Sequence, residues 1–164
     1  MMGSLIVFAV GNPSRGDDAL GPLLLRRIES QFPALVTVED FQLQIEHALD
    51  LQGRDLALFM DAAVGLGRPF RFGPVGPARH PVHSSHSLEP AEVLAVHTRA
   101  LGTPPPPAYV LALGGAAFEL GHSPSPSALK HLEAAWAFLQ PLLATPDPDL
   151  WAREARNFAL RLGA

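Results

Sequence analysis

The side chains that could do chemistry are carboxylates and an imidazole, placed where apolar runs give way to polar sequence. They are Asp18, Asp40, Asp61 and His86. If Asp18, Asp61 and His86 converge in the folded chain, their oxygen and nitrogen atoms suit a borderline divalent ion such as zinc, nickel or iron. The same three groups can instead act as acid and base toward a water molecule, with one carboxylate raising the pKa of its neighbour. Both kinds of site stay open at this point.

Each of these residues also has an ordinary structural explanation. An aspartate at a helix start, such as Asp17 or Asp18, commonly caps the helix or interacts with its dipole. An aspartate that ends a strand commonly forms a turn, and a single histidine near a helix start is commonly an exposed polar residue. We interpret Asp17 as a cap, and we expect function from the other carboxylates only if the fold brings them together.

The elements that must position these side chains are strands alternating with helices. Apolar or β-branched runs predict strands over residues 4–10, 34–40, 55–60, 69–75 and 108–114. Periodicity, caps and proline positions predict helices over residues 18–31, 43–52, 88–101, 126–144 and 149–162. The alternation predicts an α/β fold, a three-layer sandwich whose mostly parallel, twisted sheet of about five strands has helices on both faces. Residues 1–164 show no repeat or boundary and are predicted to form a single domain.

The predicted topology also says where a site would lie. In a mostly parallel sheet, ligands bind in the loops at the carboxyl ends of the strands. Residues 5–24 have the pattern of strand, tight loop and helix, which places Asp18 at that edge, and Asp61 directly follows the run 55–60. Prolines in the run 69–75 indicate an edge strand. The helical stripes predict that the following leucines and tryptophan are buried: Leu20, Leu23, Leu24, Leu129, Leu132, Trp136, Leu139 and Leu143.

Composition narrows the class of protein. The chain has 164 residues, a formal net charge of −4 and no cysteine. The lack of cysteine excludes disulfides, thiolate catalysis and cysteine-based metal sites, and the negative charge gives no electrostatic footprint for nucleic acid. No apolar run approaches the roughly 18 residues that span a bilayer, and the first one is too short for a signal peptide. We therefore expect a cytoplasmic, monomeric protein that binds neither nucleic acid nor membranes.

Other motifs that carry chemistry do not fit. The glycines within residues 11–21 lack the GxGxxG spacing of a dinucleotide site, and the Walker lysine is missing. No GxSxG elbow is present, so the serines at 84–85 are interpreted as loop residues. His80 and His83 precede His86 at intervals of three residues, but they lie in a proline-containing loop. Only His86 of these three is expected to be functional.

Three motifs together resemble the nickel–iron hydrogenase maturation proteases over about residues 4–145. They are GNPSRGDDALG near the start, FMDAA at the end of the third predicted strand, and SSHSLEPAEVL before a helix. Enzymes of that family have a twisted α/β sheet between helices. They remove a C-terminal peptide from the hydrogenase large subunit after nickel has been inserted. Their three metal-contacting positions fall, motif by motif, on Asp18, Asp61 and His86. The resemblance therefore implies a specific endopeptidase that contacts nickel carried by its substrate, the large-subunit precursor, and that has no organic cofactor.

Two departures from the family pattern stand out. Asp18 is one methylene shorter than the glutamate of some relatives, although aspartate also occurs there. A Gly-Gly-Thr turn found in many relatives is replaced by DFQLQIEHALDL, residues 40–51. That variant resembles the subgroup that matures bidirectional, NAD-reducing hydrogenases, with segments such as 43–47 selecting the partner.

Three hypotheses of function follow. The first is the endopeptidase, in which a carboxylate or a metal-bound water activates the attacking water, no serine or cysteine nucleophile is implied, and Asp40 orients the substrate. The second is a chaperone that senses nickel in a partner without cutting it. The third is a general metallohydrolase that holds its own ion tightly and acts on generic peptides.

Overall fold

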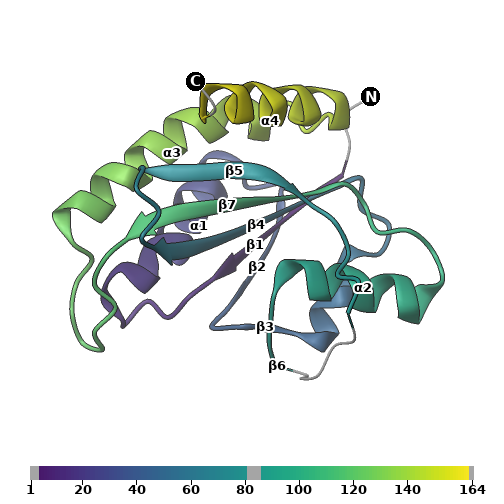
Figure 1. Ribbon diagram of the computed structural model, residues 1–164, viewed down its shortest axis with the longest axis horizontal. Coiled ribbons are helices and arrows are strands. Elements are labelled where there is room, and N and C mark those ends of the chain that lie inside the picture. The colour runs from purple at the N-terminus through teal and green to yellow at the C-terminus, as the bar shows by residue number, and fades with distance from the viewer. Residues whose placement is uncertain (1–3, 81–85, 163–164) are drawn as a thin grey trace.

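A five-stranded sheet with the order β2-β1-β4-β7-β5 forms the centre of the fold (Figure 1). The computed structural model describes residues 4–80 and 86–162, apart from the side chain of His86. The strands of this sheet are β1 (Leu5–Val10), β2 (Val36–Asp40), β4 (Leu56–Val64), β5 (Phe70–Val75) and β7 (Ala108–Gly115). Strands β2, β1, β4 and β7 are mutually parallel, and β5 pairs with β7 in the antiparallel sense at the edge. The mostly parallel sheet and the edge strand predicted from the sequence are both confirmed.

Helices cover both faces of this sheet, as predicted. One face packs against α1 (Leu20–Gln31), α3 (Pro126–Ala144) and α4 (Pro148–Leu162), and the other packs against α2 (Pro90–Leu101) and the 3-10 helix η2 (Ile45–Leu51). A short 3-10 helix, η1 (Gly16–Ala19), precedes α1, and a small antiparallel pair joins β3 (Leu43–Gln44) to β6 (His86–Leu88). No helix in the described part of the chain is long and apolar enough to cross a membrane.

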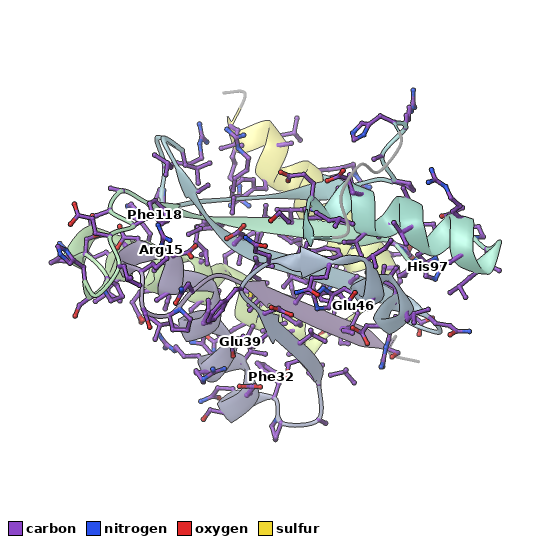
Figure 2. The ribbon with its side chains drawn as sticks, turned by 90° about the horizontal axis from the view of Figure 1, so that it is seen from below. Arg15, Phe32, Glu39, Glu46, His97 and Phe118 are labelled. Carbon is purple, nitrogen blue, oxygen red and sulfur yellow. The ribbon has the colours of Figure 1, made fainter. Side chains whose placement is uncertain are left out.

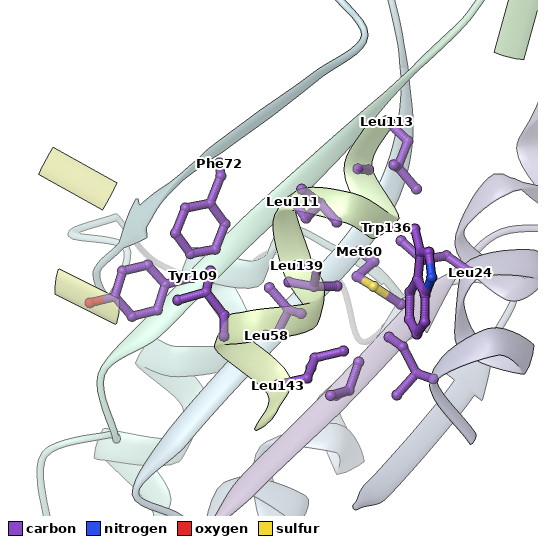
Figure 3. Close-up of a cluster of buried hydrophobic side chains, with 14 of the residues drawn as sticks. Leu24, Leu58, Met60, Phe72, Tyr109, Leu111, Leu113, Trp136, Leu139 and Leu143 are labelled. Atoms are coloured by element: carbon purple, nitrogen blue, oxygen red, sulfur yellow. The ribbon is translucent and has the colours of Figure 1, made fainter. Parts of the chain in front are cut away.

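The larger core lies between the sheet and the α1–α3–α4 layer (Figure 3). The ring of Phe72 stacks on Tyr109 with centroids 5.2 Å apart and the ring planes 7° from parallel. Trp151 of α4 packs against both rings, and its indole N–H donates a hydrogen bond to the Leu142 carbonyl at 2.9 Å. Burying side chains of this size stabilises the fold by about 1.5–3 kcal/mol each. Helix α4 therefore closes the core over the edge strand β5.

Two of the side chains predicted to be buried are not. Leu23 is 38% exposed and Leu129 is 43% exposed, whereas the remaining leucines and Trp136 of the predicted stripes are buried. In α3 the residue that faces the sheet at this level is Ala128, which is 1% exposed. A rotation of about 100° per residue then moves Leu129 to the flank of the helix. The prediction for Leu23 and Leu129 was wrong because periodicity does not fix the exact centre of the buried face.

Two elements near the carboxyl edge also differ from their predictions. Residues 43–52 do not begin as a helix, because Leu43 and Gln44 pair with β6 before η2 starts. Strand β4 does not end before Asp61, because residues 61–64 continue to pair with residues 112–115 of β7. Asp61 therefore lies within a strand that extends beyond the edge of its parallel neighbour β1.

A buried histidine lies far from this edge. His97 of α2 is 3% exposed, and it is at the opposite end of the molecule from Arg15 and Phe118 (Figure 2). It lines a small cavity of about 230 Å³ together with Arg54. Its Nδ1 has no hydrogen-bond partner among the described residues. Burial disfavours the charged imidazolium and lowers the pKa of His97 below its ordinary value of 6.5.

His97 should make the protein less stable in mild acid. Below the ordinary histidine pKa of 6.5 the unfolded chain binds a proton that the folded chain does not. The free energy of unfolding therefore decreases as the pH is lowered, by at most about 1.4 kcal/mol per pH unit for one group. In urea unfolding at about pH 7.5 and about pH 5.5, His97→Leu should lose less stability on acidification than the unsubstituted protein. If His97→Leu lost as much stability between the two pH values as the unsubstituted protein, His97 would not be the cause of the acid sensitivity.

Candidate functional site

A pocket of about 380 Å³ opens at the carboxyl edge of the sheet, where the sequence predicts a site. Its walls come from the end of β1, from residues 59–63 of β4, from residues 110 and 112 of β7, from residues 41–43 after β2, and from residues 87–90 at the start of α2. Most of these residues are apolar, but three carboxylate side chains line it as well: Asp18, Asp61 and Glu89. The pocket therefore combines an apolar wall with concentrated negative charge.

Asp18 reaches the pocket because the loop after β1 folds tightly back on itself. Its Oδ2 accepts a hydrogen bond from the Asn12 backbone N–H at 2.8 Å. Gly11 permits this turn, since its φ is +146° and a Cβ there would lie 2.1 Å from the Asp18 carbonyl oxygen. A larger residue at position 11 would push the loop away. The predicted position of Asp18 at the carboxyl edge is confirmed.

Asp61 enters the same pocket from β4, at the position paired with Ala112. The residue is exposed at the pocket mouth, yet the protein around its carboxyl group removes part of its hydration. This desolvation is the largest cause that raises the pKa of Asp61 to about 7, and the negative charges of Asp18 and Glu89 add to it. A hydrogen bond from the Ala62 backbone N–H opposes the rise. Asp61 can therefore carry or release a proton near neutral pH, as general acids and bases do.

Glu89 and Ser87 are pocket residues that the sequence analysis did not single out. Glu89 stands directly before α2, and its backbone N–H donates to the Glu92 Oε1 at 2.7 Å. Ser87 has a φ of +56°, which is uncommon for a residue other than glycine. The signal that could have found Glu89 is its place at the N-terminus of a proline-initiated helix, next to the histidine motif.

His86 is placed by its backbone only. It begins β6, where it pairs with Gln44, and it leads into the pocket-lining segment 87–90. Its side chain lies outside the described residues, so the predicted metal-contacting imidazole stays a prediction. Among the described side chains, no group of three or more histidine, aspartate or glutamate residues is arranged to hold a metal ion. The structure thus brings together two members of the predicted set, Asp18 and Asp61.

Asp40 lies beside the pocket rather than in its lining. Its Oδ2 is 3.5 Å from the Nε2 of His47, a buried histidine of η2. The Gln44 backbone N–H donates to the Nδ1 of His47 at 2.8 Å, so the ring proton of the neutral imidazole is on Nε2, facing Asp40. This pairing holds the segment between β2 and η2, in which the exposed Phe41 lines the pocket. The role of Asp40 in orienting substrate stays a prediction.

Asp17 is not a helix cap, which corrects the interpretation drawn from the sequence. It is fully buried, and it accepts hydrogen bonds from the backbone N–H groups of Ala116, Ala117 and Ser125 and from the Ser125 hydroxyl. No side-chain cap bond forms at either η1 or α1. Asp17 instead fixes the loop between β7 and α3, and adjacent Asp18 is left to face the pocket.

Several solved structures with a similar fold are hydrogenase maturation enzymes. The hydrogenase maturing endopeptidase HybD of E. coli superposes with a TM-score of 0.67 at 20% identity, covering 85% of this chain and 91% of that one. The NiFe hydrogenase maturation protease HycI of Thermococcus kodakarensis superposes with a TM-score of 0.66 at 19% identity, covering 87% of this chain and 94% of that one. The chain has the hydrogenase maturation protease fold. The hydrogenase 2 maturation peptidase of a Thaumarchaeota archaeon shares it as well, at 0.61 and 19% identity, covering 85% of this chain and 97% of that one.

No protein-family model matches the sequence, and no curated protein matches it either. At identities of 19–20% the structural likeness establishes the hydrogenase maturation protease fold, and activity has to be argued from the pocket. Asp18 of η1 and Asp61 of β4 both line this pocket, and the pKa of Asp61 is raised to about 7. Such a pair can contact a divalent ion through oxygen or activate a water molecule.

Proposed function

We propose that this protein is an endopeptidase that removes the C-terminal extension of a nickel–iron hydrogenase large subunit after nickel insertion. The observation that supports this most directly is the meeting of Asp18 and Asp61 in one pocket at the carboxyl edge of a hydrogenase maturation protease fold. The two residues are 43 positions apart in the chain (61 − 18), and both come from motifs that resemble the family. Peptide hydrolysis at this pocket makes the protein a hydrolase acting on peptide bonds.

Nickel in this proposal belongs to the substrate. Asp18 and Asp61, with His86 as implied by the family resemblance, supply three donors. Three protein donors leave at least one position of a divalent ion for other ligands. An ion already held by the precursor can therefore be contacted without being removed from it. Cleavage would then depend on nickel loading, because an empty precursor would lack the group that docks in the pocket.

The chemistry requires a water molecule to be activated and the developing oxyanion to be stabilised. Asp61 can contact the ion through one carboxylate oxygen and accept the proton of that water through the other. Asp18 is held by the Asn12 N–H and is suited to a fixed contact. The apolar wall beside them, including Phe59 and Val110, keeps bulk water from one side of the reacting bond.

Several exposed apolar side chains, of which Phe41 lines the pocket, fit a protein partner better than a small substrate. Four large apolar side chains, from the segment after β2, from η2 and from the end of β4, are exposed: Phe41 at 61%, Ile45 at 43%, Leu49 at 59% and Val64 at 69%. Exposed apolar groups of this size commonly mark protein contacts. We propose that they contact the large-subunit precursor. The NAD-reducing subgroup, a cytoplasmic location and a monomeric state stay predictions.

The test is to incubate the purified protein with nickel-loaded and nickel-free precursor and to follow the intact mass of the precursor. Shortening at the C-terminus is expected for the nickel-loaded form alone. A complex that forms without loss of mass would favour the chaperone hypothesis instead. Cleavage of generic peptides by a protein that keeps its metal through purification would favour the metallohydrolase.

A further inference from the structure

A second cavity, of about 410 Å³, lies at the same edge of the sheet as the first pocket. It is lined by the turn between β4 and β5, by the end of β7, and by Ser127 and His131 of α3. Helices α3 and α2 cover opposite faces of the sheet, so the two cavities flank the extended ends of β4 and β7 (Figure 1). The second cavity is therefore separate from the Asp18–Asp61 pocket but adjacent to it.

The cavity is lined by an arginine, Arg68, that has no partner among the described residues. Arg68 makes no hydrogen bond or ion pair with any described residue, and its Nε is buried without an acceptor. None of the described residues that line the cavity is an aspartate or glutamate. The neighbouring carboxylate of Asp17 is already occupied by four donors from residues 116–125. A partly buried guanidinium in this situation favours an anion, above all a carboxylate that can accept two parallel N–H bonds.

The opposite wall adds polar groups that suit the same ligand. The Nδ1 of His131 is 2.8 Å from the Gly114 carbonyl oxygen, which can only accept, so Nδ1 carries a proton. The Nε2 of the same ring makes no hydrogen bond with any described residue. Ser127 lies in the first turn of α3, where backbone N–H groups and the helix dipole favour negative charge.

Gly114 allows this wall to form. A Cβ at Gly114 would lie 2.8 Å from the Arg68 carbonyl oxygen, 2.9 Å from the His131 Nδ1 and 3.0 Å from the Pro69 carbonyl oxygen. The absence of a side chain lets the start of β5 and the His131 ring approach β7 closely. The wall formed by β7, the start of β5 and α3 is thus closely packed, whereas the mouth of the cavity, at Gly65, Gly67 and Ser127, is exposed to solvent.

We propose that the Arg68 cavity binds a carboxylate group of the precursor polypeptide, within about four to six residues of the bond that is cleaved. The proposal rests on the proposed function and names a specificity subsite for it. This spacing of four to six residues follows from β4. Asp61 lines the first pocket and Gly65 lines the second cavity, and the two residues are four positions apart in a chain that rises about 3.3 Å per residue as a strand. An extended substrate segment lying over the strand ends would cover that span with a similar number of residues.

The test compares Arg68→Gln with Arg71→Gln. Arg71 is an exposed arginine of β5 that does not line the cavity, so the two variants lose the same charge nearby. With nickel-loaded precursor, Arg68→Gln should raise KM about tenfold and leave kcat nearly unchanged, because a contact made equally in ground and transition states is lost. Arg71→Gln should match the unsubstituted protein. Equal behaviour of the two variants would overturn the subsite.

A second arm measures binding on the full chain without any cleavage. Backbone amide NMR would follow residues 65–68 during titration with a synthetic peptide of the precursor C-terminal segment. The same peptide with its carboxylates replaced by amides, and acetate alone, serve as comparisons. Shifts that need both the peptide carboxylates and Arg68 support the proposal. Equal binding of the amide peptide would overturn it, and equal affinity for acetate would reduce the cavity to a site for small anions.

Ser127→Asp gives an independent variant if Arg68→Gln alters the fold. An acidic residue in the first turn of α3 is compatible with the helix dipole, so the helix should stay intact. The added negative charge should repel the carboxylate and weaken peptide binding at least tenfold; unchanged binding would count against the proposal. If the unsubstituted protein leaves the precursor uncut but binds the peptide through Arg68, the protease proposal fails and the carboxylate site stands.

Discussion

Replacing Asp61 by asparagine is expected to slow processing of nickel-loaded precursor at least about a hundredfold, the range of a lost general acid or base. The substitution keeps the shape of the side chain, and Asp61 is exposed at the pocket mouth, so the fold should tolerate it. What is lost is a carboxylate that can take up a proton near neutral pH or contact the metal of the precursor. Intact-mass time courses measure the rate, and circular dichroism checks the fold.

Glu89→Gln is the matched control for this experiment. Glu89 lines the same pocket and contributes negative charge to the surroundings of Asp61, so each variant replaces one pocket carboxylate by an amide of the same shape. If Asp61 acts through its own contact, Glu89→Gln should stay within about tenfold of the unsubstituted rate. A loss as severe as that of Asp61→Asn would show that only the overall negative potential matters.

The same experiment extends to the other predicted members of the site. Asp18→Asn should also reduce processing strongly, because the carboxylate lines the pocket opposite Asp61. His86→Ala tests the one member whose position rests on the family resemblance. Full activity of either variant, with the fold intact, would remove that residue from the proposed site.

Replacing Asp17 by asparagine is expected to lower the free energy of unfolding by about 2–4 kcal/mol. The carboxylate is fully buried and accepts four hydrogen bonds, three from backbone N–H groups and one from the Ser125 hydroxyl. An asparagine has a single acceptor oxygen, and its amide group would face N–H donors. At least one backbone N–H of the loop between β7 and α3 would then stay buried without an acceptor.

Denaturant unfolding measures this loss, and Glu119→Gln provides the comparison. Glu119 lies in the same loop, but its side chain is 75% exposed and its ion pair with His122 faces solvent. That substitution should change stability by no more than about 0.5 kcal/mol. A comparable loss in both variants would mean that loop charge, rather than the buried hydrogen bonds of Asp17, holds the loop.

Acid should weaken the same set of bonds. Burial alone would raise the pKa of Asp17, but the N–H groups of Ser125, Ala116 and Ala117 outweigh it, so its pKa lies below the ordinary 3.8. The stabilisation by Asp17 is therefore complete above about pH 3.8 and is lost as the pH falls through the lower value of the folded state. Asp17→Asn should remove this part of the acid sensitivity.

The order of strands and helices, and the edge at which the site lies, followed from the sequence. Apolar runs and helix caps are local features, so strand β1, the helix after Ser125 and the position of Asp18 at a strand end could be predicted from neighbours in the chain. The parallel sheet followed because alternating strands and helices have few other ways to pack. The same reasoning predicted that Asp18 and Asp61 would lie close together, and both line one pocket in the structure.

The tertiary structure decided which of Asp17 and Asp18 is buried and which lines the pocket. The two residues are adjacent and identical in type, yet Asp17 is bonded to residues about a hundred positions away, between 116 and 125, whereas Asp18 faces the pocket. Glu89 and Arg68 also acquire their surroundings from distant segments. Local patterns record periodicity and turn chemistry, but the partner of a polar group depends on which loops meet at the sheet edge. That meeting exists only once β4, β7 and the helices have packed together.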